Sequence, residues 1–495
     1  MYLYIRMFLL MIISLYTTRV VLNTLGVSDY GIYSAIGGLV VTFSFLSNVL
    51  SNASQRFFAV EIGKGDKEGL KTAFNSIIVS YILLCFVIVL LLETIGLWFV
   101  LNKMTIPPDR LDIAITIFHF SVLTFVVSIM STPFNALIVA HEDMKIFSYL
   151  SIIEGLLKLS VAFLLIYIVA DKLRLYAILL FTVACIILIS YYVISKKLYK
   201  ININLKIEKN KIKEIFGYSS WTLFGTLAGV ANGQCVNIML NIFYGPIANA
   251  AYAIGSQISN VLSQFSSNFF SAIRPSLMKS YVSSEFKRME ELFYIGNKML
   301  FLLMFIILLP IYFEIEFLLK IWLGKVEPYM ISFTRLLLIY TSVLTLSYPI
   351  TTIVQAAGAV KKYHGIVDTF TLLSLPISLF ILKFGGQPEI VFIVSISIFA
   401  IAHAIRLIIL KTVVKFSLFE YFTQFIIPMI VVMMLSIGVT SIVKFFIPWN
   451  SIITSLIVIG ISVISVVFLV YFIMLSNTER HKIKNVITKQ FGSKK

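Results

Sequence analysis

Fourteen apolar runs of about 20 residues succeed one another along the chain, and each is long enough to cross a bilayer as a helix. Only 13% of the 495 residues are charged, whereas soluble domains average about 25%, so the chain cannot hide its apolar surface within itself. A transmembrane β-barrel would show alternating segments of roughly ten residues. Continuous runs instead predict helices, which satisfy their own backbone hydrogen bonds in lipid. We therefore predict an all-α integral membrane protein. The predicted spans are 2–22, 32–55, 73–100, 113–139, 146–170, 175–195, 217–243, 247–273, 299–319, 331–356, 365–383, 389–410, 421–443 and 451–475.

The positive charges indicate how these spans cross the membrane. If the N-terminus is cytoplasmic, the loops on the cytoplasmic side hold 28 of the 40 Lys and Arg residues, and the opposite loops hold 9. Membrane proteins carry such an excess in their cytoplasmic loops, and one miscounted span would scramble the asymmetry beyond the error. The pattern favours fourteen spans with both termini cytoplasmic. It also accounts for the net charge of +17 without a nucleic-acid partner.

Two groups of residues recur at nearly the same distance along the chain, which indicates a duplication. Six identities recur after 218 residues, from Leu22 to Arg56 and again from Leu240 to Arg274, and four more recur after 216 residues. Because six is even, two six-helix halves have the same orientation, as in carriers with parallel repeats. The predicted organisation is an N-terminal six-helix lobe (1–195), a basic cytoplasmic linker (196–216), a C-terminal six-helix lobe (217–410), an appended helix pair (411–475) and a basic cytoplasmic tail (476–495).

Charged side chains within the spans are candidate functional groups, because ionisable residues are costly at membrane depth. Glu154 and Lys158 lie four residues apart and share a helix face. They serve either as a structural pair or as part of a cavity wall. Asp368 stands alone near the cytoplasmic end of its span, where it either couples transport to an ion or proton or reaches the water of the loop.

Arginines near the span ends are candidate ligands for a phosphate group, because the forked guanidinium binds phosphate through charge-assisted hydrogen bonds. Arg6 lies one to three turns inside the first span. For Arg19, snorkelling to the interface is an adequate alternative. Arg56 and Arg274 end their helices at the cytoplasmic side, where charges that simply orient the protein are the alternative. The functional interpretation places these arginines in a central cationic cavity.

Three spans carry many amide side chains, and amides in lipid need hydrogen-bonding partners. They serve either as contacts between helices or as the wall of a hydrated cavity that binds sugars, and their presence in both halves favours the cavity. The candidates are Asn48, Asn52, Gln55, Asn232, Gln234, Asn237, Gln257, Asn260, Gln264 and Asn268.

Pro133 and Pro349 occupy matching places in spans four and ten. Proline removes a helix hydrogen bond, so we predict hinges there.

The sequence shows no catalytic or cofactor motif. No GxSxG, Walker A, HExxH or GxGxxG motif occurs in the context it requires. His119 and His403 lie in apolar runs without a carboxylate or cysteine at ligand spacing, which favours core histidines over metal ligands. We therefore predict a protein that is not an enzyme and needs no cofactor or metal. Active transport would then draw on an ion gradient or on the membrane potential.

Several segments of the first 170 residues resemble the O-antigen and polysaccharide-unit flippases of the multidrug/oligosaccharidyl-lipid/polysaccharide exporter superfamily. They are YIRMFLLMIISLYTTRVVLNTLGVSDYGIYSAIGGLV (4–40), SNASQRFFAVEIGKGD (51–66), TPFNALIVAHEDMK (132–145) and IIEGLLKL (152–159). The second half is similar mainly in hydropathy, in the linker and in the final helix pair. These motifs are diffuse, so their specificity comes from length and order.

The resemblance implies a MATE-like transporter in the bacterial inner membrane. Such flippases move undecaprenyl-pyrophosphate-linked oligosaccharide repeat units to the periplasmic leaflet by alternating access of two lobes around a cationic cavity. The partners it implies are the polyprenyl-linked oligosaccharide, membrane lipid and polysaccharide-assembly proteins. No family motif assigns individual substrate-binding residues, so the residues named above are predicted on physical grounds alone.

Particular features of the chain distinguish a flippase from other possible functions. A drug or cation antiporter of the same superfamily should favour intramembrane carboxylates, and twelve spans would suffice; the arginines and the extra helix pair favour an anionic lipid. A lipid II flippase has the same architecture and stays an alternative. A polysaccharide polymerase or ligase needs a sizeable periplasmic loop with catalytic Arg or His, and no predicted outer loop exceeds about 13 residues. A scaffold would have no use for polar spans in both halves.

Overall fold

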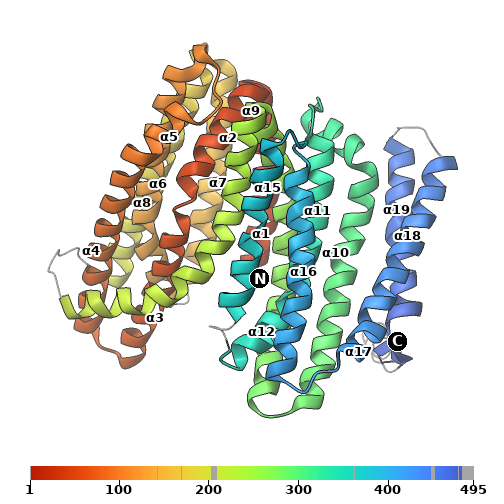
Figure 1. Cartoon of the computed structure of the whole chain (residues 1–495). Coiled ribbons are helices and arrows are strands. Elements are labelled where there is room, and N and C mark those ends of the chain that lie inside the picture. The colour runs from red at the N-terminus through yellow and green to blue at the C-terminus, as the bar shows by residue number, and fades with distance from the viewer. Residues whose placement is uncertain are drawn as a thin grey trace, which may run out of the picture. The chain divides into compact units, whose positions relative to one another are not determined.

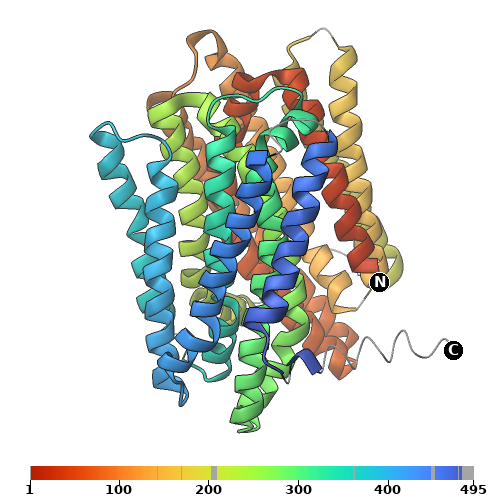
Figure 2. The ribbon, with the colours of Figure 1, turned by 90° about the vertical axis from the view of Figure 1, so that its right-hand side faces the viewer.

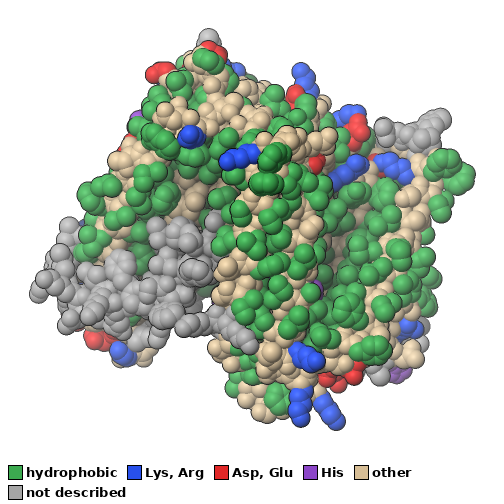
Figure 3. All heavy atoms as spheres, viewed as in Figure 1, with side chains coloured by type: hydrophobic (Ala, Val, Ile, Leu, Met, Phe, Trp, Pro, Cys, Tyr) green, Lys and Arg blue, Asp and Glu red, His purple; other side chains and the backbone are tan. Residues whose placement is uncertain are grey.

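A computed structural model of the chain confirms an all-helical membrane protein. It describes residues 2–141, 143–168, 170–201, 209–359, 363–446, 452–477 and 479–481, without the side chains of 2–5, 45, 46, 48, 49, 52, 56, 59, 60, 209–229 and 231. Within these ranges there is no β-strand, and twelve helices are long and apolar enough to cross a membrane. On the face shown in Figure 3, hydrophobic side chains cover the middle of the helices and charged side chains gather near their ends.

The helices follow one another with short connections (Figure 1). Their bounds are α1 (Tyr2–Leu25), α2 (Val27–Val41), α3 (Ser44–Lys64), α4 (Lys67–Leu91), η1 (Leu92–Gly96), α5 (Leu97–Asn102), η2 (Pro108–Arg110), α6 (Leu111–Ala140), α7 (Met144–Tyr167), α8 (Lys172–Tyr199), α9 (Lys209–Val282), α10 (Phe286–Leu323), α11 (Met330–Thr345), α12 (Tyr348–Ala356), η3 (His364–Asp368), α14 (Thr369–Leu372), α15 (Ser374–Lys383), α16 (Ile390–Val413), α17 (Leu418–Tyr421), η4 (Phe422–Ile426), α18 (Ile427–Phe446), α19 (Ile452–Leu469) and η5 (Val470–Met474).

The twelve candidate spans differ from the predicted fourteen at two places. The first is α9, whose 74 residues form one helical segment although the backbone at Gly245 is non-helical, with φ of 74°. This break separates the predicted spans 217–243 and 247–273, and a positive φ is a conformation that glycine adopts without strain. The second is the predicted span 32–55, which is divided between α2 and α3. The count of fourteen stays a prediction.

The chain packs as two compact units. Unit 1 comprises Met1–Ala253 and Leu379–Pro388, and unit 2 comprises Ile254–Ser378 and Glu389–Lys495. The lobes predicted from the repeat are a different division, because they are the two halves expected to move during transport. Their limits stay predictions. Each unit is described below by itself.

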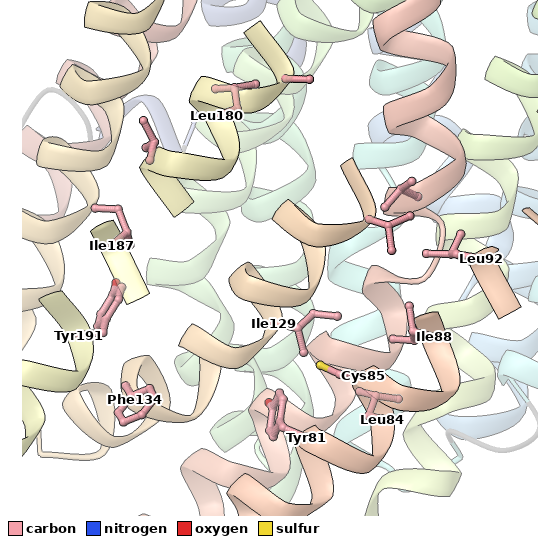
Figure 4. Packing of buried hydrophobic residues seen from close by; sticks show 14 of the residues in the cluster. Tyr81, Leu84, Cys85, Ile88, Leu92, Ile129, Phe134, Leu180, Ile187 and Tyr191 are labelled. Carbon is pink, nitrogen blue, oxygen red and sulfur yellow. The ribbon is translucent and has the colours of Figure 1, made fainter. Parts of the chain in front are cut away.

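The core of unit 1 is built where α4, α6 and α8 present apolar side chains to one another (Figure 4). In α4 these residues recur every three or four positions, the spacing of a single helix face. They are Tyr81, Leu84, Cys85 and Ile88 of α4, Leu92 of η1, Ile129 and Phe134 of α6, and Leu180, Ile187 and Tyr191 of α8. Of these helices, α6 and α8 also pack against α7, which carries polar residues described below.

Arginine–aspartate pairs join the helix ends on the predicted outer side of unit 1. Arg110, just before α6, donates from Nη1 to Oδ2 of Asp171 at 2.8 Å and lies 3.3 Å from Oδ2 of Asp29 in α2. Arg174, near the start of α8, pairs with Asp112 in the first turn of α6. These pairs link the outer ends of α2, α6 and α8.

In unit 2, α10 is broken at Glu314, and side chains of α18 and α19 stabilise the break. Glu314 has φ of −103° and ψ of 16° inside the helix, and it is only 3% exposed. Lys444 of α18 donates to the carbonyl of Phe313 at 2.6 Å and to the Glu314 carboxylate at 2.8 Å. Ser455 of α19 donates to the second carboxylate oxygen at 2.7 Å. Buried backbone and carboxylate oxygens need such donors, so the break depends on α18 and α19.

A second buried ion pair joins α10 to the chain after α19. Lys298, 4% exposed, lies 2.9 Å from Oε2 of Glu479 and 3.2 Å from its Oε1. Ser476 and Glu479 form a reciprocal capping box, in which each backbone N–H donates to the other side chain. Figures 1 and 2 show α18 and α19 side by side next to α10. The helix pair of α18 and α19 is therefore joined to α10 by ion pairs at both ends of the pair.

Acid should weaken the contact between Glu479 and Lys298. Burial raises the pKa of Glu479, but hydrogen bonds from Lys298 and from the Ser476 backbone outweigh it and hold the pKa below its ordinary value. Such a carboxylate stabilises the fold above its unfolded pKa of about 4.3, and that stability is lost as the pH falls through the folded pKa. We expect the wild type to melt at a higher temperature than Glu479→Gln at pH 7 and the two to converge below about pH 4. A difference that stays constant with pH would contradict this assignment.

Candidate substrate-binding site

A polar groove opens in unit 1 between α1 and α7. Its volume is about 420 Å³. Gly155 allows the close approach of the two helices, because a Cβ at that position would lie 2.9 Å from a methyl carbon of Leu10. The groove is lined by Leu10, Ile13, Ser14, Thr17 and Thr18 of α1 and by Ser151, Glu154, Gly155 and Lys158 of α7. Hydroxyl and charged groups at membrane depth are costly unless they serve a site or a partner.

Arg6 lies at the edge of this groove with unused hydrogen-bonding capacity. Its Nη1 donates to the hydroxyl of Ser151 at 3.2 Å, and its guanidinium lies 4.3 Å from the centre of the Phe147 ring. Its Nε has no hydrogen-bond partner among the described residues. No described carboxylate lies within 4.0 Å of Arg6. A half-buried arginine without an acidic partner can bind an incoming anion through its remaining donors.

Glu154 and Lys158 lie in the same groove and contact each other. Nζ of Lys158 is 2.6 Å from Oε1 of Glu154, and both side chains are more than one-third exposed. The structure thus places Arg6 of α1 on Ser151, three residues before the Glu154–Lys158 pair that the sequence singles out on α7. The roles of Arg6 and of this pair in substrate binding or coupling stay predictions.

The remaining candidates of unit 1 are placed differently. Arg19 is half-buried in α1 and does not line the groove. The side chains of Asn48, Asn52 and Arg56 lie outside the described residues. Their roles stay predictions.

Asn237 belongs to a buried chain of amides around the break in α9. It is 3% exposed, donates to the carbonyl of Ser34 at 3.1 Å and accepts from Nδ2 of Asn249 at 2.6 Å. Asn241 donates to Oδ1 of the same Asn249 at 2.8 Å. These contacts join the two parts of α9 across Gly245 and tie them to α2. They use one donor and the oxygen of the Asn237 amide, and its predicted role as a sugar ligand is not tested by them.

A smaller polar groove lies in unit 2 along α9 and the start of α12. Its volume is about 240 Å³, and it is lined by Asn260, Ser263, Gln264, Ser267, Asn268 and Tyr348. Farther along α9, Arg274 is exposed and donates from Nη2 to Oε1 of Gln355 in α12 at 3.0 Å. Gln257 is half-buried and is not part of the lining. Hydroxyl and amide groups of this kind can exchange hydrogen bonds with a saccharide.

The two candidate hinges have different surroundings. Pro349 stands in the first turn of α12, just after the helical span has been interrupted between Thr345 and Tyr348. Pro133 is buried inside α6, which runs through it without a break. Proline fits the first turn of a helix, since no hydrogen bond is lost there. Whether either position bends during transport stays a prediction.

Two histidine–carboxylate pairs lie at turns of π-helix, one in each unit. Asp368 ends η3, and its Oδ2 is 2.7 Å from Nδ1 of His364. Glu93 lies in η1, and its Oε2 is 2.9 Å from Nδ1 of His119. π-Helical turns are frequent at functional sites. The sequence interpretation did not identify Glu93 or the buried Glu314, although each is an acid inside an apolar run, the same signal that marks Glu154.

The described residues contain no group of three or more His, Cys, Asp or Glu side chains that is suited to a metal ion. The polar groups that line the two grooves are hydroxyls, amides and the Glu154–Lys158 ion pair, and Arg6 contacts Ser151 of the first groove. Such groups recognise anions and sugar hydroxyls.

The fold is that of transporters of the MOP superfamily. The structure is similar to a lipid II flippase MurJ in an inward closed conformation, with a TM-score of 0.70, 15% identity and coverage of 94% of this chain and 97% of that one. It is also similar to an inward-facing multidrug resistance MATE family transporter, with a TM-score of 0.69, 14% identity and coverage of 81% and 94%. At these identities the similarity shows the fold alone.

The sequence comparisons identify the family. The chain is 24% identical over 292 residues to the uncharacterized membrane protein EpsK of Bacillus subtilis (strain 168). That match covers 58% of this chain and 56% of EpsK, so it spans just over half the length of the relative. The family model described as "Polysaccharide biosynthesis protein" matches residues 1–281, which includes α1, α7 and the groove between them. The chain therefore belongs to the family of polysaccharide biosynthesis proteins.

Proposed function

We propose that this protein is a flippase that moves an undecaprenyl-pyrophosphate-linked oligosaccharide, an O-antigen or capsule repeat unit, across the bacterial inner membrane. The substrate has a charged pyrophosphate, a polyhydroxylated sugar part and a lipid tail. Its transfer requires a protein that shields the first two from the hydrocarbon core. Alternating access of the two halves, with both termini cytoplasmic, is part of the proposal.

The observation that carries the proposal is Arg6 at the edge of the α1–α7 groove. Its guanidinium keeps unused donors, and no described carboxylate neutralises it. A phosphate oxyanion is the natural acceptor for such a group. The hydroxyl-rich lining beside it provides hydrogen-bonding partners for the first sugar.

Two further features support the proposal. The amide groove of unit 2 offers hydrogen-bond donors and acceptors without a net charge, as a neutral sugar requires. Membership of a polysaccharide biosynthesis family is consistent with a saccharide cargo, and the fold is shared with the lipid II flippase MurJ.

Asp368 with His364, and Glu154 with Lys158, are the proposed groups for coupling to an ion gradient. Polysaccharide-assembly enzymes would then act on the substrate before and after transfer.

A leaflet assay in proteoliposomes tests this function. A fluorescent undecaprenyl-pyrophosphate oligosaccharide is placed in the inner leaflet, and its appearance outside is followed with a lectin that cannot cross the membrane. We expect transfer that depends on the protein and that is faster than transfer of the same lipid without its sugar.

Parallel assays separate the alternatives. Transfer of lipid II at a higher rate than of the oligosaccharide lipid would identify a lipid II flippase. Proton-linked efflux of a cationic dye, without transfer of either lipid, would identify a drug antiporter. Either result would overturn the proposed function.

A further inference from the structure

A cavity of unit 2 lies on the predicted outer side, where the chain passes from α10 to α11. Its volume is about 860 Å³, within the range of small-molecule sites. It is bounded by the end of α10, by the loop from Gly324 to Tyr329 and by the first turns of α11. It is separate from the amide groove of the same unit, with which it shares no lining residue.

Arg335 of α11 lines this cavity and is held there by α10. Its Nε donates to the carbonyl of Tyr312 at 3.1 Å, and its guanidinium lies 5.0 Å from the centre of the Tyr312 ring. That carbonyl lies two residues before the break at Glu314, so the bend in α10 provides the acceptor that positions the arginine. Only Nε is used in this contact, and the two Nη groups keep their donors. A guanidinium held in this way loses little side-chain freedom when it binds a ligand.

The other charges of the cavity leave Arg335 without a direct ion pair among the described residues, and Glu316, the nearest carboxylate in electrostatic terms, is bound to Lys320. Lys320 and Glu316 neutralise each other at 2.8 Å. Lys325 and Glu327 also line the cavity, and neither forms an ion pair with a described residue. No described carboxylate lies within 4.0 Å of Arg335. The cavity therefore holds three cations and two carboxylates, with Arg335 free to accept one negative charge.

This mixture of charges selects among anions. The lining has one more positive than negative charge, so it compensates a single negative charge better than the several charges of a pyrophosphate. The two carboxylates would accept hydrogen bonds from hydroxyl groups, as would the Ser332 hydroxyl in the same wall. A ligand with one negative charge and several hydroxyls satisfies both requirements.

We infer that this cavity is a second saccharide site, which binds an acidic sugar through its carboxylate on Arg335 and its hydroxyls on Glu327 and Ser332. The inference rests on the proposed function, since it assigns the site to the oligosaccharide on the side where it is released. The proposed ligand is a sugar with one negative charge, such as a hexuronate. The headgroup of an anionic lipid shares this chemistry and is the alternative that the test must separate.

Binding to the purified full chain in nanodiscs of zwitterionic lipid tests the inference without requiring transport. The probe is a glucuronate-containing oligosaccharide, and its matched control is the same oligosaccharide with the carboxylate reduced to an alcohol. We expect the acidic sugar to bind at least about tenfold more tightly, the value of one charge-assisted contact of about 1.4 kcal/mol. Arg335→Gln should remove this preference, Arg335→Lys should keep part of it, and Lys103→Gln, which removes a cation of unit 1 outside the cavity, should keep all of it.

Several outcomes would overturn the inference. Equal binding of the acidic and reduced sugars would do so, as would the same loss in Lys103→Gln as in Arg335→Gln. Competition by phosphatidylglycerol nanodiscs that abolishes sugar binding would assign the cavity to a lipid headgroup. Melting temperatures of the variants show whether a loss of binding reflects a loss of fold. If acidic sugar does not bind while the leaflet assay still shows transfer, the second site fails and the proposed function stands; if transfer fails as well, both are wrong.

Discussion

Replacing Lys444 with methionine should lower the free energy of unfolding by about 3–5 kcal/mol, the cost of leaving a buried charge without its partner. Glu314 is 3% exposed and would keep only the hydroxyl of Ser455 as a donor. The carbonyl of Phe313 would lose its donor too. The measurement is unfolding of the purified protein in a titration of mixed detergent and SDS, followed by tryptophan fluorescence.

The reverse change and a matched pair on the same helix make this prediction specific. Glu314→Gln should cost less, because Lys444 is 36% exposed and can turn to water. The double change Glu314→Leu with Lys444→Met should recover much of the loss, since it removes both charges. Lys320→Met breaks the exposed pair with Glu316 and should change the free energy by less than about 1 kcal/mol. Equal losses for Lys320→Met and Lys444→Met would show that the buried pair has no special role.

Replacing Arg6 with alanine should lower the initial rate of oligosaccharide-lipid transfer by about tenfold to a hundredfold. A hydrogen bond to a charged group contributes about 1.5–3 kcal/mol, and Arg6 offers donors that no described residue uses. Arg6→Lys should retain an intermediate rate, because the charge stays while the fork that also reaches Ser151 is lost. The leaflet assay in proteoliposomes measures each rate at equal protein content.

Arg288→Ala is the matched control for Arg6→Ala. Arg288 is a surface arginine near the start of α10, 67% exposed and paired with Glu285 at 3.3 Å, so its loss should leave the rate within a factor of about two. A rate unchanged in Arg6→Ala would remove Arg6 from the substrate site while leaving the function intact. Similar losses in both variants would point to a general effect of positive charge.

Local patterns in the sequence were enough to predict the fold class and one contact within a helix. The apolar runs predict the helices, because the requirement to satisfy backbone groups in lipid leaves little else. The spacing of Glu154 and Lys158 predicts their contact, which the structure shows at 2.6 Å. Each of these inferences uses residues that lie within one helix.

The contacts that organise unit 2 join residues far apart in the chain, and no local window contains both partners. Glu314 and Lys444 are 130 residues apart, and Lys298 and Glu479 are 181 apart. The count of loop charges treats Lys298 and Lys444 as charges that orient the protein. Lys298 is nevertheless buried, at 4% exposed. A charge near a span end has the same appearance in the sequence whether it faces water or a distant acid.

The two ion pairs between α10 and the appended helices restrict how the chain can be shortened. A version that ends after α16 would leave Glu314 and Lys298, sixteen residues apart on one helix, without their ion-pair partners. It would also uncover the apolar face of α10 against which α19 packs. A derivative without α18 and α19 would therefore need apolar replacements at both positions, and a domain exchange with a relative would have to carry α10, α18 and α19 together.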